Sequence, residues 1–501
     1  MSVSYVGSIS SPVLQSILDM RSQLDVLQQQ LGSGEKSTTY AGLGTDRGIA
    51  LSLQSQLSAI SSYDSTMQIA GVRLTAAQTA LTSVDSITHT VMNSASNSPY
   101  SIDQTGQTTD QKSAYNQLDQ LLSMFNTQVG NHYLFSGTAG DQPAVASTDL
   151  ILNGDGIHAG LKQVISERQQ ADLGANGLGR LSLTNPTATS VAITEDAAPP
   201  FGLKLSTVNS TLSGATVTGP AGSPASLSID FASNPNAGEQ MTIGFTLPDG
   251  TTQNLTMTAT TASPPGADQF TIGATPAATA ANLQAALTTS IGKIGATTLT
   301  AASAMAASND FFNTDSANPP QRVDGPPFDT ATGLVDGTSA NTVSWYTGED
   351  STTPARSTAG AQIDPSMSVN YGMRANEQAL RLAVQNIAVF AATSYSASDP
   401  NAGDSYAALT SRVATALNGA PGQQSVTDIE AQLAGAQTAI SAAQTRHSQT
   451  TNMLTDLLQN IEGVSQDEVG TQILSLQTSL QASLQTTALL SKLSLVNFLP
   501  T

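Results

Sequence analysis

The chain has 501 residues, of which 39% are hydrophobic and 11% are charged, and its formal net charge is −20 at pH 7. The length predicts about two to four domains, and the acidic balance argues against binding to nucleic acid or to an anionic membrane surface, whose charges would repel it. Because cysteine is absent, disulfides, thiolate metal sites and cysteine nucleophiles are excluded.

Neither a classical secretory signal nor a membrane span is expected. The first cation is Arg21, and no apolar stretch follows the first residues as it would in a signal peptide. No apolar run approaches the roughly 18 residues that a membrane-spanning helix needs. Export from the cell would therefore use a secretion route that recognises another kind of signal.

The first predicted helix, residues 12–31, carries apolar residues at alternating steps of four and three. This is the spacing of a coiled coil, and a single helix in water leaves such an apolar stripe exposed to solvent. The stripe comprises Val13, Ile17, Met20, Leu24, Leu27 and Leu31. We therefore expect a partner helix, which is either the other end of the chain or a copy of the same chain.

A second helix is predicted over residues 50–95, after a loop at 32–46. Five apolar residues recur there at an unbroken interval of seven, which indicates a coiled-coil-like helix. They are Leu53, Ile60, Met67, Leu74 and Leu81, and we interpret them as packing residues. A third helix is predicted over about residues 108–129, ending at Gly130.

The middle of the chain changes from helical to alternating periodicity and gains Pro, Gly and Thr. Apolar residues alternate from Met241 to Leu247 and again from Leu255 to Ala259, on either side of Pro248-Asp249-Gly250. This pattern predicts a β-hairpin. A strand at Phe270–Ile272 and a short helix at about 277–289 follow, so residues 181–339 are predicted to form a β-rich insertion.

Helices return at residue 370. Two segments, around Leu380–Phe390 and Leu409–Leu417, precede a long amphipathic helix that starts near Ile429. A second coiled-coil stripe then runs to the C-terminal end, with one slip of five residues. It comprises Leu454, Leu457, Ile461, Val464, Val469, Ile473, Leu476, Leu480 and Leu484. Helical ends around a β-rich middle predict an α+β fold in an elongated, hairpin-like molecule.

The two terminal stripes allow two interpretations. In the first they pair only within one chain. In the second, which we favour because two thin helices bury little surface, they also bind neighbouring subunits. The residues expected at that assembly interface are Val13, Ile17, Leu24, Leu27, Leu31, Leu454, Ile461, Ile473, Leu476 and Leu480.

Patterns for catalysis, a metal or a cofactor are lacking in the sequence. The histidines, His89, His132, His158 and His447, lie in separate segments without metal-ligand spacing. The Gly-rich loop 42–48 follows a helix and lacks the Gly-Lys-Ser/Thr ending of a phosphate loop, and residues 153–156 offer too few carboxylates for calcium. We therefore expect no catalytic residues, no metal and no cofactor. Trp345 is interpreted as a core residue, with the anchoring of a partner as the alternative.

Five local sequences, together with this order of elements, resemble one known family. They are Leu31–Lys36 (LGSGEK), Tyr133–Gly137 (YLFSG) followed by Pro143, Trp345–Asp350 (WYTGED) with Arg356, Tyr371–Glu377 (YGMRANE), and Leu489–Leu499 at the end. They are similar to the bacterial flagellin superfamily, most of all to the hook–filament junction proteins of the hook-associated protein 3 type in their alphaproteobacterial form. The resemblance covers roughly residues 1–180 and 340–501.

The resemblance implies a domain plan and a set of partners. Residues 1–45 and 455–501 would form an inner coiled-coil assembly domain, residues 46–180 and 340–454 a mainly helical tube domain that contains the packing residues of the second helix, and residues 181–339 a surface-exposed insertion. It also implies type III export as an unfolded chain, a cytoplasmic export chaperone, and assembly in the bacterial flagellum with copies of itself, flagellin and an adjacent hook-associated protein.

Two departures from the family pattern bear on the alternatives. Most members carry an Asp-Asp pair soon after the first turn, where this chain has Leu43–Gly48 (LGTDRG), and true flagellins usually finish on leucines and an arginine, where this chain has Phe498–Thr501 (FLPT). The second departure favours a junction protein over a filament flagellin, which is the alternative. A secreted adhesin that uses the flagellar export route is a further alternative. An enzyme hosted in the insertion is disfavoured because residues 181–339 contain no histidine and no clustered carboxylates.

Overall fold

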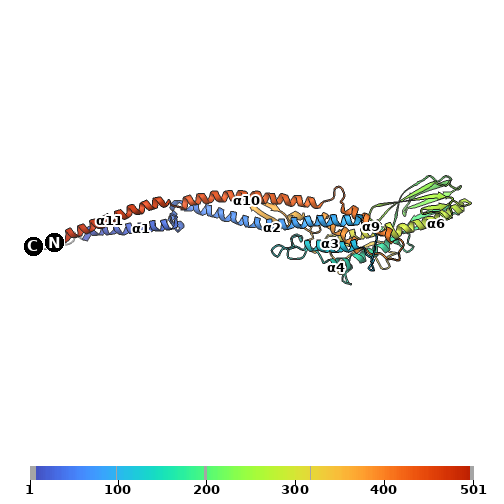
Figure 1. The fold of residues 1–501 in the computed structure, drawn as a ribbon, viewed down its shortest axis with the longest axis horizontal. Helices are drawn as coiled ribbons and strands as arrows, with labels where there is room; N and C mark the ends of the chain where they lie inside the picture. Colours follow the sequence, from blue (N-terminus) through green and yellow to red (C-terminus); the bar gives the residue numbers. More distant parts are fainter. Residues whose placement is uncertain (1–6, 98, 197–199, 316–317, 497–501) are drawn as a thin grey trace. The chain divides into compact units, whose positions relative to one another are not determined.

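The computed structural model describes residues 7–97, 99–196, 200–315 and 318–496, which fold into helices and β-sheets (Figure 1). Two compact units form from segments that are distant in sequence. Met1–Ile69, Gln362–Val369 and Thr438–Thr501 make the terminal unit, and Ala70–Ala361 with Asn370–Gln437 make the central unit. The predicted α+β class, with long terminal helices and a β-rich insertion, is confirmed.

Long helices build the terminal unit. It contains α1 (Gly7–Ser33), a 3-10 helix (Tyr40–Asp46), the first part of α2 (Arg47–Asn97), the last part of α10 (Val426–Glu462) and α11 (Gln466–Val496). α1 and α11 pack along one another, as the blue and red ribbons in Figure 1 show. The predicted second helix is confirmed as α2, which is continuous over 51 residues.

α1 and α10 end beside each other. The residue after α1, Gly34, adopts a φ of +72°, and its N–H donates to the carbonyl four residues back, an ending that favours glycine. α10 ends at Glu462, where the slip of five residues in the C-terminal stripe occurs. An antiparallel bridge joins the two ends: the N–H of Lys36 donates to the Glu462 carbonyl at 2.6 Å, and the N–H of Val464 donates to the Gly34 carbonyl at 3.0 Å.

The helical part of the central unit is built around α8 (Gln378–Ala392). This helix packs against α3, α7 and α9 and is buried on nearly all sides, as expected for a helix that is apolar all round. This part also contains α3 (Thr109–Phe125), α4 (Thr148–Asn153), α5 (Leu161–Leu173), α7 (Thr300–Phe312) and α9 (Ala402–Leu417), together with the end of α2 from Ala70 and the start of α10 up to Gln437. Trp345 is fully buried and donates from Nε1 to the Phe312 carbonyl at 2.9 Å, so it fills this core.

α3 is shorter than the predicted helix of residues 108–129. Its start agrees, because Thr108 and Gln111 form a capping box. Its end differs because the Asn126 side chain binds the backbone of Val145 through two hydrogen bonds of 2.9 and 3.0 Å. This tertiary contact removes Asn126 from the helix, and α3 ends at Phe125.

The insertion contains two four-stranded sheets. One, of order β1-β2-β5-β4, is antiparallel, and the other has the order β3-β6-β7-β8 with a parallel pair at β7 and β8. The strands are β1 (Leu181–Thr184), β2 (Ser190–Glu195), β3 (Lys204–Ser210), β4 (Ala215–Ala221), β5 (Ser226–Phe231), β6 (Gln240–Thr246), β7 (Thr252–Thr260) and β8 (Gln269–Thr271). The predicted hairpin is confirmed as the β6–β7 pair.

Both sheets share one core with α6 (Pro276–Ile294), the helix beside the strands in Figure 1. α6 extends beyond the predicted end at about residue 289 and continues through a π turn (Gly295–Leu299) into α7. Because α7 packs against α5 and α8, the predicted insertion of residues 181–339 includes a helix that belongs by packing to the helical part.

Two small hairpins complete the described elements. β9 (Gln321–Val323) pairs with β10 (Leu334–Asp336), and β11 (Gly360–Asp364) pairs with β12 (Met367–Asn370), just after a 3-10 turn at Ala355–Thr358. The tip of the second hairpin, Gln362–Val369, belongs to the terminal unit.

Candidate functional site

The ten predicted assembly residues all lie in the terminal unit. Five are on α1 (Val13, Ile17, Leu24, Leu27, Leu31), two on α10 (Leu454, Ile461) and three on α11 (Ile473, Leu476, Leu480). Ile17, Leu454 and Ile473 are buried, Leu31 is exposed, and the other six are half-buried. Pairing within one chain therefore covers only part of this apolar surface.

A second set of apolar side chains, which the sequence analysis missed, lies on the same two helices and points to solvent. The exposed fraction is 60% for Leu14 and 52% for Leu18 on α1, and 65% for Leu474 and 62% for Leu489 on α11. We call this set the outer row; it comprises Leu14, Leu18, Val26, Leu474 and Leu489. Its signal was present in the sequence, because Leu14 and Leu18 each directly follow a residue of the predicted stripe.

Exposed apolar residues continue beyond the α1–α11 pair. Ile49 and Leu51 on α2, and Met453 and Leu457 on α10, are each between 42% and 55% exposed. Single exposed apolar residues are ordinary, whereas a repeated set along packed helices indicates an interaction surface.

The five heptad residues of α2 face inward. Leu53, Met67, Leu74 and Leu81 are buried and Ile60 is half-buried. α2 contacts α10 within each unit. In the terminal unit the Tyr63 and His447 rings lie 6.1 Å apart, and in the central unit the Thr82 hydroxyl donates to Glu430 at 3.3 Å.

Three of the segments that carry the family resemblance meet in the central unit. These are residues 133–137, 345–350 and 371–377, and we call them the three-segment cluster. The Ser136 carbonyl accepts from the N–H of Glu349 at 2.9 Å, and the N–H of Gly137 donates to the Met373 carbonyl at 3.0 Å. Gly137 adopts a φ of +64°, a backbone conformation that favours glycine, and a Cβ there would lie 3.1 Å from the Cβ of Glu349.

The arginines beside this cluster bind groups of the same chain. Arg356 donates to the Gly372 carbonyl at 2.6 Å and forms an ion pair with Glu377. Arg374 donates to the carbonyls of Ser351 and Thr353, both at 2.6 Å. These guanidinium groups therefore hold the loops of the cluster in place.

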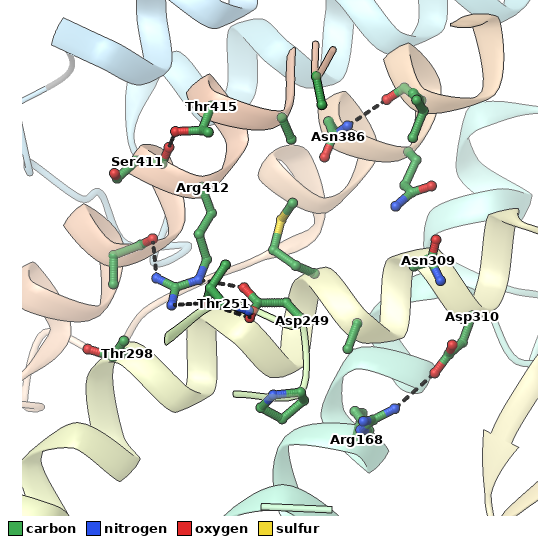
Figure 2. Close-up of a pocket in the computed structure, with 18 of the residues that line it drawn as sticks. Arg168, Asp249, Thr251, Thr298, Asn309, Asp310, Asn386, Ser411, Arg412 and Thr415 are labelled. Atoms are coloured by element: carbon green, nitrogen blue, oxygen red, sulfur yellow. Dashed lines mark hydrogen bonds and ion pairs between the residues drawn. The ribbon is translucent and has the colours of Figure 1, made fainter. Parts of the chain in front are cut away.

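A pocket of about 970 Å³ lies in the central unit between α7, α8, α9 and the β6–β7 turn (Figure 2). On one side Arg412 donates from Nε to Asp249 at 2.8 Å and from Nη2 to Thr251 at 3.2 Å. On the other side Arg168 donates to Asp310 at 2.9 Å and also pairs with the buried Asp172 at 2.8 Å.

These pairs neutralise the charges of the pocket internally. Burial raises the pKa of Asp310 to about 6, and Arg168 opposes that rise. The lining also includes neutral groups such as Thr298, Asn309 and Ser411. No histidine is among the described residues that line the pocket, and no group of three His, Cys, Asp or Glu side chains in the described part of the chain could hold a metal ion.

No helix among the described residues is long and apolar enough to cross a membrane. The geometry defines an α+β protein whose two ends pair as helices and keep an exposed apolar outer row.

One comparison with known proteins agrees with this class. Residues 8–140 match the model of the bacterial flagellin N-terminal helical region. The matched stretch is 133 of the 501 residues and includes α2, α3 and nearly all of α1. It supports the flagellin superfamily and, with it, a structural subunit of the bacterial flagellum, a polymer outside the cell. A comparison with curated proteins found no match.

Proposed function

We propose that the chain is a subunit of the hook–filament junction of the bacterial flagellum, exported unfolded and assembled through its terminal helices. The observation that carries the proposal is the incomplete burial of α1 and α11. Most of the stripe is only half-buried, and the outer row is exposed, after the two helices have paired within one chain. The apolar surface that is left is the surface that neighbouring subunits would cover.

The proposed domain plan follows from the same helices. Residues 1–45 and 455–501 form the inner assembly domain, residues 46–180 and 340–454 the tube domain, and residues 181–339 the solvent-facing insertion. The bridge between Lys36 and Glu462 supports these limits, because it lies close to both proposed domain boundaries and coincides with the ends of α1 and α10.

The choice of the junction over the filament rests on the three-segment cluster. The segments that resemble junction proteins contact one another through backbone hydrogen bonds, so the resemblance extends over one packed region of the central unit. The last residues, Phe498–Thr501, which also favoured a junction protein, lie outside the described residues. The proposed partners are copies of the chain, flagellin, an adjacent hook-associated protein and an export chaperone.

A deletion strain tests the position in the flagellum. A junction subunit is required to attach filaments, so its loss should leave cells without filaments and with flagellin shed into the medium. Shortened or altered filaments on the same cells would instead identify a filament subunit. Normal filaments with normal motility would contradict both assignments.

A double variant tests the assembly surface. Ile461→Glu with Leu476→Glu places two charges at half-buried positions of the predicted interface, and burial of an unpaired charge is costly. We expect loss of incorporation into flagella, while circular dichroism and protease resistance of the central unit are unchanged. Asn460→Glu with Gln477→Glu adds the same charges at neighbouring exposed positions and should incorporate normally. Normal incorporation of the first variant would refute the proposed interface.

A further inference from the structure

His447 lies on α10 in the terminal unit and is 4% exposed. Its ring sits between two carboxylates from distant parts of the chain. Nδ1 is 2.8 Å from an Asp64 oxygen on α2, and Nε2 is 2.9 Å from an Asp364 oxygen on β11. Asp364 also accepts a hydrogen bond of 2.7 Å from Arg446.

This arrangement fixes the protonation state of the ring. A neutral imidazole carries one N–H and can donate to only one of the two carboxylates, whereas an imidazolium donates from both nitrogens. Carboxylates accept but do not donate when ionised. Both contacts are therefore hydrogen bonds only when His447 is positively charged.

The charges around the ring depend on this proton. The titratable and charged groups that face it are Asp64 and Tyr63 from α2, Asp364 from β11, and Arg446, its neighbour on α10. With His447 protonated, two positive charges balance two carboxylates. Without the proton, one ring nitrogen presents a lone pair to a carboxylate oxygen, and two carboxylates share the single charge of Arg446.

We propose that His447 is a pH-sensitive clip, in which the imidazolium holds the hairpin tip Gln362–Val369 on α2 and α10 and deprotonation releases it. The ring joins three elements of the terminal unit, since Asp364 is on the hairpin tip, Asp64 is on α2 and His447 is on α10. The clip depends on contacts within one chain and is independent of the proposed flagellar function.

The direction of the pH dependence follows from the surroundings. Burial lowers the pKa of His447, but the hydrogen bonds and charges of Asp364 and Asp64 outweigh it and raise the pKa above the usual 6.5. The stabilisation is therefore complete below pH 6.5 and is lost as the pH rises through the raised value. The hydrogen bonds from His447 and Arg446 lower the pKa of Asp364, so that carboxylate stays charged at mildly acidic pH.

Proton titration of the full chain tests the charged state directly. The protein has four histidines, and the Cε1 resonance of His447 can be assigned as the one that His447→Gln removes. We expect a titration midpoint above 6.5 that falls in Asp64→Asn and in Asp364→Asn, because each variant removes one ionic acceptor. A midpoint at or below 6.5, or a midpoint that neither variant moves, would overturn the clip.

Hydrogen exchange of the hairpin tip tests its release. Peptides covering residues 362–369 should exchange about tenfold more slowly in wild type than in His447→Gln at pH 6, because a hydrogen bond to a charged group is lost in the variant. The two proteins are compared at the same pH, so the chemical exchange rate cancels. The difference should fall to less than about twofold above the His447 midpoint.

The exchange experiment includes a matched control variant and a replacement variant in case His447→Gln does not fold. His89→Gln alters a histidine that pairs with Asp85 at 3.6 Å on the exposed face of α2, and it should leave the exchange of the tip unchanged at every pH. If His447→Gln does not fold, Asp64→Asn takes its place in the exchange experiment. A wild-type-to-variant ratio that is constant with pH would refute the proposal.

Discussion

The outer row offers the sharpest test of assembly, because its side chains contribute little to the single chain. Leu18→Gln with Leu474→Gln removes two of them from α1 and α11 without adding charge or a poor helix former. Both side chains point largely to solvent, so the free energy of unfolding of the free variant should lie within about 0.5 kcal/mol of the wild-type value. The effect should appear only when subunits cover this surface.

The magnitude can be worked from the exposed fractions. Full burial of a leucine side chain is worth about 1.5–3 kcal/mol. Leu18 is 52% exposed and Leu474 is 65% exposed in the single chain, so roughly half of that gain in each is available only on assembly. Together the two exposed fractions represent about 1.8–3.5 kcal/mol per subunit, which is about a 20- to 300-fold change in incorporation, since 1.4 kcal/mol is tenfold.

A competition assay measures this ratio. Wild type and variant are expressed at equal levels in one strain, and mass spectrometry compares their ratio in isolated flagella with their ratio in the secreted, unassembled pool, which corrects for export. Ser22→Gln with Ser475→Gln changes neighbouring exposed polar positions and should incorporate within about threefold of wild type. Equal incorporation of the leucine variant would show that the outer row stays in solvent in the polymer.

Three further predictions concern the central unit. Phe390→Ala empties a fully buried site on α8 and should lower the free energy of unfolding by about 3–5 kcal/mol in a urea titration; a loss below about 1 kcal/mol would contradict the packing of α8. Arg412→Ala leaves the largely buried Asp249 unpaired, so hydrogen exchange of the β6–β7 turn should accelerate while that of α3 does not, and unchanged exchange at the turn would contradict the ion pair. Burial raises the pKa of Asp310 from 3.8 to about 6, so between these pH values the folded state binds a proton that the unfolded state does not, and stability falls as the pH rises through this range. Asp310→Asn should abolish that part of the dependence of the free energy of unfolding on pH. A variant with the same pH dependence as wild type would refute the raised pKa.

Elements with a strong local pattern were predictable from the sequence. The seven-residue interval of α2, the apolar positions of α8 and the Pro-Asp-Gly turn of the β6–β7 hairpin each specify an element on their own, because periodicity and turn chemistry act over short distances. The structure bears out all three. The two stripes at the ends likewise indicated helices, and they lie on α1 and on the end of α10 with α11.

Features that depend on long-range contacts were not predictable. α3 ends early because Asn126 binds Val145, 19 residues away, and α6 runs on into α7 because α5 and α8 offer a surface on which to pack. The two carboxylate partners of His447 could not be identified from the sequence, since Asp64 and Asp364 are 383 and 83 residues away. Contacts between residues so far apart produce no recognisable spacing in a single sequence. The exposure of Leu14 and Leu18 could have been predicted. A helix that packs against a single neighbour needs only one apolar stripe, so apolar residues beside that stripe are left for another contact.

Under the proposed function, the same incomplete burial that would drive assembly would also require protection before export. A chain whose terminal helices fully satisfied one another would have no apolar surface to offer a neighbour, and a chain with unpaired ends would expose the whole stripe in the cytoplasm. In this chain the stripe is partly covered within the molecule and the outer row is not. Under the proposed function, a chaperone that prevents premature polymerisation would therefore have to cover the outer row of α11, rather than the stripe that faces α1. Leu474 and Leu489 are the most exposed apolar residues among those of α11 whose side chains the structure describes.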